Sequence, residues 1–274
     1  MLADRQVALI GGGHIAEIII HRLTQGKVLS GARIIVSDPA PSRREHLSGR
    51  FGITPAVDNV EAAQRGDLVF ICVRPEVVQA ILPDLQAARL GPDQVIVSVA
   101  AGIPLSTYES LGEKQPLVRA LPNPPSRVGQ GIAPLVFSPA VTPDQRELVL
   151  ALFDALGEVV EVEESHLNAI TSLSSPVSTY LFFQALIDAG VGCGLPRPVA
   201  TQVASQTIVG SMAVWRSRQA APAELIAEAS TPGGVSVESL AVLEQHGFEA
   251  AVVDAIAQGA ARAAELGKES SSTR

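Results

Sequence analysis

The first half of the chain alternates short apolar runs with segments of helical spacing. Five nearly continuous apolar runs are bounded by Gly, Pro, Asp or Asn: QVALIGG from residue 6, ARIIVSD from 32, DLVFICV from 67, QVIVSVA from 94 and APLVF from 133. Between them, residues 14–25 and 76–88 place apolar side chains at helical intervals. Continuous apolar strands separated by helices are typical of a parallel sheet covered on both faces. The pattern therefore predicts a doubly wound α/β sheet.

The pattern changes near residue 142, after which nearly every segment has helical spacing. The exception is the short apolar run EVVEVEE at 158–164. The helical segments cover residues 142–157, 177–195, 197–218, 236–247 and 249–267. We therefore predict two domains, an α/β domain of residues 1–160 and an all-helical domain of residues 161–274.

A glycine motif follows the first apolar run. Gly11, Gly13 and Ala16 form G-x-G-x-x-A at a predicted strand-to-helix turn. In this motif the first glycine permits the tight turn, the second lets a pyrophosphate approach, and the third small residue packs helix on strand. Amide groups at the helix start, from His14 and Ile15 onward, would bind the phosphates. The motif predicts a Rossmann-type dinucleotide site, and the alternative is a glycine-rich turn without a ligand.

Asp38 ends the second run, about where such a site carries the acid that binds the adenosine ribose. This acid favours the 2′-hydroxyl of NADH, and we expect a slight preference for NADH within NAD(P)H. Arg43 and Arg44 favour NADPH instead, because guanidinium groups bind a 2′-phosphate well. A solvated helix start explains the two arginines equally well.

Further candidates stand where later runs end, since an open α/β sheet binds its ligand at the carboxyl ends of its strands. Val73, Arg74 and Pro75 begin VRPEVV, and Ala100 lies in VAAGIP; we expect their backbone to line the nicotinamide side. The segment VRALPNPPSRVGQG at 118–131 places Asn123 between prolines, which predicts a rigid loop.

Two interpretations of this rigid loop remain open. Arg119 and Asn123 face the crevice, where Asn123 would orient the nicotinamide ribose, or Asn123 makes an Asx-type turn beside a surface arginine.

The second informative stretch is ASTPGGVSVESL at 229–240. A Pro-Gly-Gly turn leads into a helix, and such a turn directs backbone N–H groups toward an anion. Thr231 and Ser236 add hydroxyl groups. The alternative is that Ser236 is the N-cap of the helix, and both interpretations are compatible.

Composition narrows the class of partner. The net charge of −8, without a basic cluster, argues against nucleic acid and anionic membranes. Hydrophobic residues make up 47% of the chain, which indicates a large core or a buried subunit interface. Cys72 and Cys193 both lie in apolar stretches, so we expect two buried thiols in a reducing, cytoplasmic setting. No cluster has metal-ligand spacing, so we expect no metal.

The chain also lacks an obvious proton donor. Its lysines are Lys27, Lys114 and Lys268, and none lies near a plausible crevice in the helical half. Reduction of a ketone generally needs such an acid, whereas an iminium substrate arrives already protonated. This favours a small imine as the substrate.

Taken together, eight motifs resemble the pyrroline-5-carboxylate reductases over about residues 5 to 267. In chain order they are IGGGHIAE, VRPEVV, VAAGIP, VRALPNPP, NAITSLS, ALIDAGVGCGLPR, TPGGVSVESLAVLEQHGF and AARAAELG. The resemblance implies a Rossmann domain followed by a helical domain that forms a homodimer or a larger homo-oligomer. It also implies hydride transfer from NAD(P)H to the C=N bond of a cyclic imino acid, which gives proline.

The resemblance assigns the second stretch to the substrate. Backbone N–H groups of Gly233, Gly234 and Val235 would hold the substrate carboxylate, beside the hydroxyl of Thr231. Ser236 matches a threonine whose hydroxyl hydrogen-bonds the ring nitrogen, which makes it the candidate catalytic residue.

Several positions depart from the family pattern. SPVSTY at 175–180 replaces a glycine-containing run, Arg74 replaces a lysine, Val235-Ser236 replaces Thr-Thr, and Glu228 replaces a neutral amide. Two alternatives therefore remain beside proline formation. One is a reductase of a different cyclic imine in a specialised pathway, and the other is a non-catalytic NAD(P)-binding paralogue.

Overall fold

The computed structural model describes residues 2–272, and for residues 268–272 only their main chain. The chain divides into two compact units, which are described separately below. The first contains the residues up to Ser175 together with those from Ala257 onward, and the second is Pro176–Ile256. The domains predicted as 1–160 and 161–274 stay a prediction.

An eight-stranded sheet forms the centre of the first unit, in the order β3-β2-β1-β4-β5-β6-β7-β8. The strands are β1 (Val7–Ile10), β2 (Ile34–Ser37), β3 (Thr54–Pro55), β4 (Leu68–Ile71), β5 (Val95–Ser98), β6 (Leu117–Ala120), β7 (Gly131–Phe137) and β8 (Gly157–Glu161). Neighbouring strands are parallel apart from β6 and β7. The predicted doubly wound parallel sheet is confirmed, with one antiparallel pair added.

That antiparallel pair corrects the prediction of a loop over residues 118–131. β6 occupies the start of this segment. Its four residues are too few to give a recognisable strand pattern ahead of the proline-rich stretch that follows. The connection to β7 contains only the 3₁₀ turn η4 (Pro124–Val128). A parallel return needs a longer crossover, usually a helix, so the chain folds back antiparallel.

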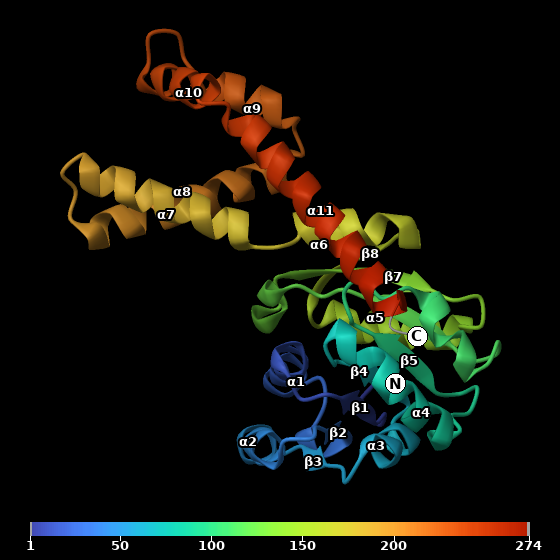
Figure 1. Cartoon of the computed structure of the whole chain (residues 1–274). Helices are drawn as coiled ribbons and strands as arrows, with labels where there is room; N and C mark the ends of the chain where they lie inside the picture. The colour runs from blue at the N-terminus through green and yellow to red at the C-terminus, as the bar shows by residue number, and fades with distance from the viewer. Residues whose placement is uncertain (1, 273–274) are drawn as a thin grey trace. The chain divides into compact units, whose positions relative to one another are not determined.

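Helices cover both faces of the sheet (Figure 1). One face packs against α1 (His14–Gln25), α2 (Pro41–Phe51) and α5 (Pro143–Asp154), and the other against α3 (Asn59–Arg65) and α4 (Val78–Ala88). Successive residues of a strand point to opposite faces, so Val7 and Leu9 belong to one core cluster while Ala8 and Ile10 belong to the other. This is why the strands read as continuous apolar runs.

Short elements complete the first unit. The remaining 3₁₀ turns are η1 (Gly31–Arg33), η2 (Pro75–Val77), η3 (Leu105–Leu111) and η5 (Glu164–His166), and α6 is Leu167–Leu173. The last helix, α11 (Phe248–Ser272), belongs to this unit from Ala257 onward. A Cβ atom at Gly102, in the loop after β5, would lie 2.9 Å from the nitrogen of Gly267 and 3.0 Å from the carbonyl oxygen of Ala263. Two glycines therefore allow the close approach of α11 to this loop.

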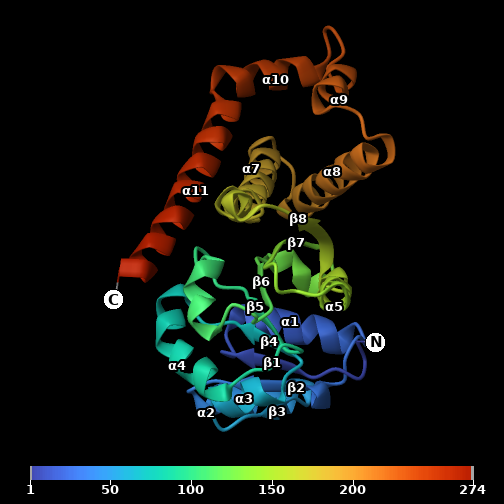
Figure 2. The same ribbon diagram turned by 90° about the vertical axis from the view of Figure 1, so that its right-hand side faces the viewer.

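The second unit is helical. It contains α7 (Val177–Gly192), α8 (Arg197–Arg218), α9 (Pro222–Ala229), α10 (Val235–Gln245) and the start of α11. α7 and α8 lie side by side in both views (Figures 1 and 2) and bury Ile187, Ala200 and Ala204 between them. A Cβ atom at Gly190 would lie 3.0 Å from that of Ala200, so small residues allow the two helices to approach closely.

Much apolar surface of this unit remains exposed. Exposed large side chains include Val177, Leu181, Val203, Val209, Val242 and Val253. A monomeric protein rarely leaves so many such side chains on one set of helices, which indicates an interface.

The two cysteines have different environments. Cys72 is buried, and burial raises the pKa of its thiol. The prediction that Cys193 is buried is wrong, because this residue follows the last turn of α7 and is exposed. Within residues 2–272, no helix combines the length and apolar character needed to cross a membrane.

Candidate functional site

The glycine turn, residues 11–13, follows the end of β1, which lies between β2 and β4 in the sheet. Gly11 has φ +93°, and its N–H donates to the carbonyl of Ser37 at the end of β2, at 2.8 Å. A Cβ atom on Gly11 would lie 2.9 Å from Cγ1 of Val73 and 3.1 Å from the carbonyl group of Cys72. Both the backbone angle and the space therefore require glycine here.

The helix that follows begins without a side-chain cap. Gly13 is the N-cap of α1, its backbone is extended, and no side chain accepts from the first turn. A Cβ atom on Gly13 would meet no atom within 4 Å, so the space in front of the helix is open. The first N–H groups of a helix have no partner within the helix and carry partial positive charge. With His14 and Ile15 in this turn and Ala16 fully buried behind it, these residues fit a dinucleotide pyrophosphate.

Asp38 lies directly after β2 and contacts the glycine turn. Its Oδ2 accepts from the N–H of Gly12 at 2.8 Å, and its Oδ1 accepts from the N–H of Ala40 at 2.9 Å. A carboxylate has about four lone-pair positions, so both oxygens retain acceptor capacity for a ribose hydroxyl. The backbone contacts fix the carboxylate beside the turn, which suits the predicted role.

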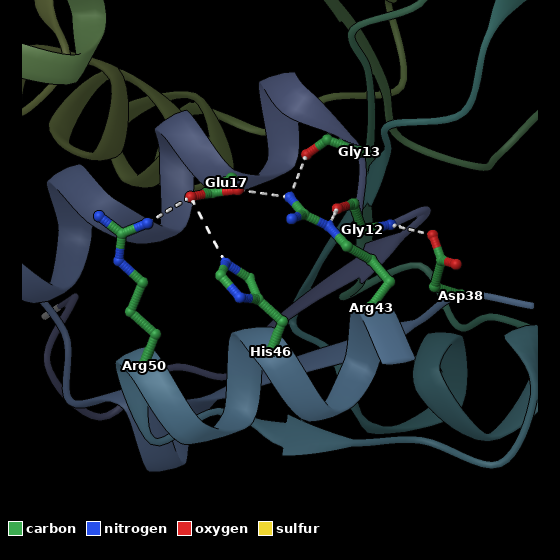
Figure 3. Close-up of polar contacts among 7 residues, drawn as sticks. All are labelled: Gly12, Gly13, Glu17, Asp38, Arg43, His46 and Arg50. Atoms are coloured by element: carbon green, nitrogen blue, oxygen red, sulfur yellow. Dashed lines mark hydrogen bonds and ion pairs between the residues drawn. The ribbon is translucent and has the colours of Figure 1, made fainter. Parts of the chain in front are cut away.

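Arg43 is held on the glycine turn by a residue that the sequence analysis missed (Figure 3). Its Nε donates to the carbonyl of Gly12, and its Nη2 donates to the carbonyl of Gly13 at 3.3 Å and to Oε2 of Glu17 at 2.6 Å. The interpretation of Arg43 as a solvated helix-start residue is therefore wrong. The signal for Glu17 is an acid in the first turn of α1 opposite basic residues spaced three and four apart.

Arg44 has a different neighbour, since its Nη1 donates to the carbonyl oxygen of Asp38. It also lines a cavity of about 420 Å³ beside α2. Pro41, Glu45, Ser48, Gly49 and Pro55 form the rest of its lining. The other residues predicted for the cofactor do not line this cavity, so we assign no cofactor role to it.

The candidates after β4 and β5 lie at the same edge of the sheet as the glycine turn. Val73 is half-buried against Gly11, and Pro75 starts η2. The side chain of Arg74 is 81% exposed and pairs with Glu76 at 3.1 Å. Ala100 is buried after β5.

Arg119 and Asn123 are both engaged within the first unit. Arg119 is 3% exposed in β6 and donates from Nη1 to Oε1 of Glu164 at 3.0 Å, so the surface-arginine alternative is wrong. The amide nitrogen of Asn123 donates to the carbonyl of Ser174 at 2.9 Å, and its oxygen accepts from the N–H of Ile132 at 2.9 Å. These contacts make Asn123 a clamp between the η4 segment, β7 and the end of α6. Its role toward a nicotinamide ribose stays a prediction.

In the second unit, the Pro-Gly-Gly turn precedes α10. Gly233 has φ +72°, and the N–H of Gly234 donates to the carbonyl of Thr231 at 2.9 Å. Proline followed by a positive-φ glycine is typical of a type II turn. A Cβ atom on Gly234 would lie 2.6 Å from Oγ1 of Thr231, so glycine is required at both positions.

The interpretation of Ser236 as an N-cap is wrong. α10 begins at Val235 with Gly234 as its N-cap, and no side chain caps it. Ser236 therefore lies in the first turn and is exposed together with Val235.

Glu228 at the end of α9 accepts from Arg218, with Oε1 2.7 Å from Nη2. This hydrogen bond lowers the pKa of the Glu228 carboxyl, and its negative charge is paired within the unit. The departure from a neutral amide thus comes with its own counter-ion.

The part of the chain that the structure describes contains no cluster of metal-ligating side chains. No three His, Cys, Asp or Glu residues come together there in a way that could hold an ion.

The fold and the first of these sites define a Rossmann-type dinucleotide-binding protein. A family model described as pyrroline-5-carboxylate reductase dimerisation matches residues 164–266. A second model, described as NADP oxidoreductase, coenzyme F420-dependent, matches residues 6–102. A pyrroline-5-carboxylate reductase of Synechocystis sp. is 34% identical over 96% of this chain and 98% of its own length. The chain belongs to the pyrroline-5-carboxylate reductase family.

Solved structures agree with this assignment. A pyrroline-5-carboxylate reductase from Coxiella burnetii has a TM-score of 0.86 at 26% identity, covering 96% of this chain and 98% of that one. The Plasmodium falciparum pyrroline carboxylate reductase, solved with NADP bound, has a TM-score of 0.89 at 22% identity, covering 97% and 100%. The predicted fold class, a Rossmann sheet followed by a helical dimerisation domain, is confirmed.

Replacement of Gly11 by alanine should weaken nucleotide binding. The new Cβ atom would collide with Val73. Alanine would also have to adopt the positive φ of this position, which costs about 1 to 2 kcal/mol. Titration calorimetry with AMP should show an affinity at least about tenfold lower than in the unchanged chain. Gly49→Ala in α2 is the matched control, since a Cβ atom there would meet no atom within 4 Å. Equal AMP affinity in Gly11→Ala and Gly49→Ala would contradict the assignment of the turn.

Proposed function

We propose that this chain reduces pyrroline-5-carboxylate to proline with NAD(P)H, as a cytoplasmic oxidoreductase of amino-acid biosynthesis. The observation that supports it most is the presence of two glycine-capped helix starts, one at Gly13 and one at Gly234, in a member of this family. The first suits a dinucleotide phosphate, and the second suits a small carboxylate.

The first unit binds and orients the cofactor. N–H groups after Gly13 bind the pyrophosphate, whereas that of Gly12 already donates to Asp38. Asp38 accepts from the adenosine ribose. The backbone of Val73, Arg74 and Ala100 lines the nicotinamide side, near Pro75 and Asn123. We expect NADH to be preferred over NADPH, because Asp38 disfavours a 2′-phosphate while Glu17 neutralises Arg43.

The second unit recognises the substrate. N–H groups of Gly233 and Val235 bind the carboxylate, while that of Gly234 already closes the turn onto Thr231. The Ser236 hydroxyl accepts a hydrogen bond from the protonated ring nitrogen, and the Thr231 hydroxyl adds a polar contact to the carboxylate.

When bound, the reduced nicotinamide supplies the hydride for the C=N carbon. Because the iminium already carries its proton, these residues act by orientation more than by acid–base chemistry.

Turnover tests the reaction and the cofactor preference together. We expect purified protein to oxidise the reduced cofactor only when pyrroline-5-carboxylate is present. The loss of absorbance at the nicotinamide band measures this oxidation. We expect kcat/KM to be higher with NADH than with NADPH. A faster reaction with another cyclic imine would support the specialised-pathway alternative, and no turnover of any cyclic imine would support the non-catalytic one.

Ser236→Ala should reduce kcat/KM for the imine by about tenfold to hundredfold, because one hydrogen bond to a charged group is lost. The affinity for AMP should stay unchanged. Ser239→Ala in the same helix is the control, since the Ser239 hydroxyl donates to the carbonyl of Val235 within α10. A Ser236→Ala enzyme with full kcat/KM would show that this hydroxyl has no role.

We further propose that the second unit forms a homodimer or a larger homo-oligomer. The family model for dimerisation spans its helices, and large apolar side chains are exposed on them. Burying this surface between copies would stabilise the assembly.

Val209→Glu on α8 should break this assembly. Val209 is 61% exposed in the single chain, and the interface would bury it. A carboxylate buried there without a partner is costly. Light scattering should show a shift toward the monomer mass of 28.5 kDa. The matched control is Val57→Glu in the first unit, where the side chain is 86% exposed. An unchanged mass for Val209→Glu would argue against α8 as part of the interface.

A further inference from the structure

Glu17 lies at the centre of a charge cluster between α1 and α2 (Figure 3). Its side chain is 13% exposed, and its Oε2 lies 2.6 Å from Nη2 of Arg43. On the other side, its Oε1 lies 2.9 Å from Nη1 of Arg50 and 3.9 Å from Nε2 of His46. One carboxylate of α1 thus faces three basic side chains of α2.

The charge balance of this cluster keeps Glu17 ionised. Burial raises the pKa of its carboxyl, but the hydrogen bond and charge of Arg43 and the charges of Arg50 and His46 lower it further than burial raises it. The net effect is a pKa below the ordinary value. At neutral pH, Glu17 is therefore a permanent anionic partner for Arg43.

Arg43 lies close to the atoms that recognise the adenosine ribose. A Cβ atom on Gly12 would lie 3.4 Å from Cγ of Arg43 and 3.4 Å from Oδ2 of Asp38. The stem of Arg43 and the Asp38 carboxylate therefore flank the same glycine. The guanidinium, however, points along the turn to the carbonyls of Gly12 and Gly13 and to Glu17.

We infer that Glu17 is a specificity-determining residue for the cofactor, because it holds the Arg43 guanidinium on the glycine turn and away from the adenosine 2′ position. A 2′-phosphate then meets the Asp38 carboxylate without Arg43 to pair with, while Arg44 donates to the carbonyl oxygen of Asp38. This inference rests on the cofactor part of the proposed function and does not depend on which imine is reduced.

Arginine pairs with phosphate through two parallel hydrogen bonds, so its release would favour a 2′-phosphorylated cofactor. Loss of the Glu17 charge leaves Arg43 with two backbone carbonyls, which are weaker partners than a carboxylate. Glu17→Gln keeps the size of the side chain, removes its charge and leaves one amide oxygen as a weaker acceptor.

The test measures binding of two adenine nucleotides by titration calorimetry. The probes are AMP and adenosine 2′,5′-bisphosphate, which differ only in the 2′-phosphate. We expect Glu17→Gln to raise the affinity for the bisphosphate relative to AMP by about tenfold. We expect Arg43→Gln alone to change this ratio by less than about twofold, because Arg43 does not reach the 2′ position while Glu17 holds it. In the double variant the gain of Glu17→Gln should disappear.

Glu45→Gln controls for the general effect of removing a negative charge. Glu45 lies on α2 and is exposed. As at Glu17, the replacement is glutamine. In Glu45→Gln, the affinity for the bisphosphate relative to AMP should stay within about twofold of that of the unchanged chain.

Three results in the variants at Glu17 and Glu45 would overturn the inference. They are an unchanged ratio in Glu17→Gln, an equal gain in Glu45→Gln, and a gain that persists without Arg43. A marked loss of bisphosphate affinity in Arg43→Gln alone would also overturn it, since Arg43 would then already bind the 2′-phosphate.

These outcomes differ from a failure of the proposed function. Nucleotide binding without turnover of any cyclic imine would count against the reaction and leave the inference standing. Failure of the unchanged chain to bind either nucleotide would overturn both the cofactor site and this role of Glu17.

Discussion

The first unit depends on the position of β1 in the middle of a sheet that is covered on both faces. Val7, Ala8, Leu9 and Ile10 are fully buried, with β2 on one side and β4 on the other. Where such a strand ends, the chain must turn sharply between its neighbours, and only Gly11 tolerates the backbone angle and the close approach of Val73. The turn places the start of α1 at the carboxyl edge of the sheet, and Asp38 and Ala100 follow strands that end at the same edge.

The two units use the same device at two helix starts. Gly13 and Gly234 are both N-caps with extended backbone, and neither helix has a side-chain cap. A serine or aspartate in either place would satisfy a backbone N–H group itself, whereas glycine leaves these groups for a bound anion. One chain thus carries one helix start suited to a pyrophosphate and another suited to a carboxylate, which is the pair of anions that reduction of an imino acid requires.

Several of these features were predictable because they depend on residues that are close in sequence. The strand runs, the start of α1 and the extent of α8 follow from local pattern, and α8 begins and ends where the sequence predicts. The antiparallel pair of β6 and β7 was not predictable in this way. Four residues of β6 precede a proline-rich segment, and their pairing depends on β7 as a partner rather than on a pattern of their own.

The sequence by itself determined the parallel, doubly wound part of the sheet, the glycine turns and the family, because each depends on the identity and spacing of neighbouring residues. Only the tertiary structure decided the partners of the charged side chains. Glu17 and Arg43 are 26 residues apart in sequence, with β2 between them, yet α1 and α2 bring them to 2.6 Å. Arg119 is likewise buried against Glu164, and Arg218 neutralises Glu228. Ion pairs of this kind form between elements that meet only after packing, so their geometry is set by the fold and not by local sequence.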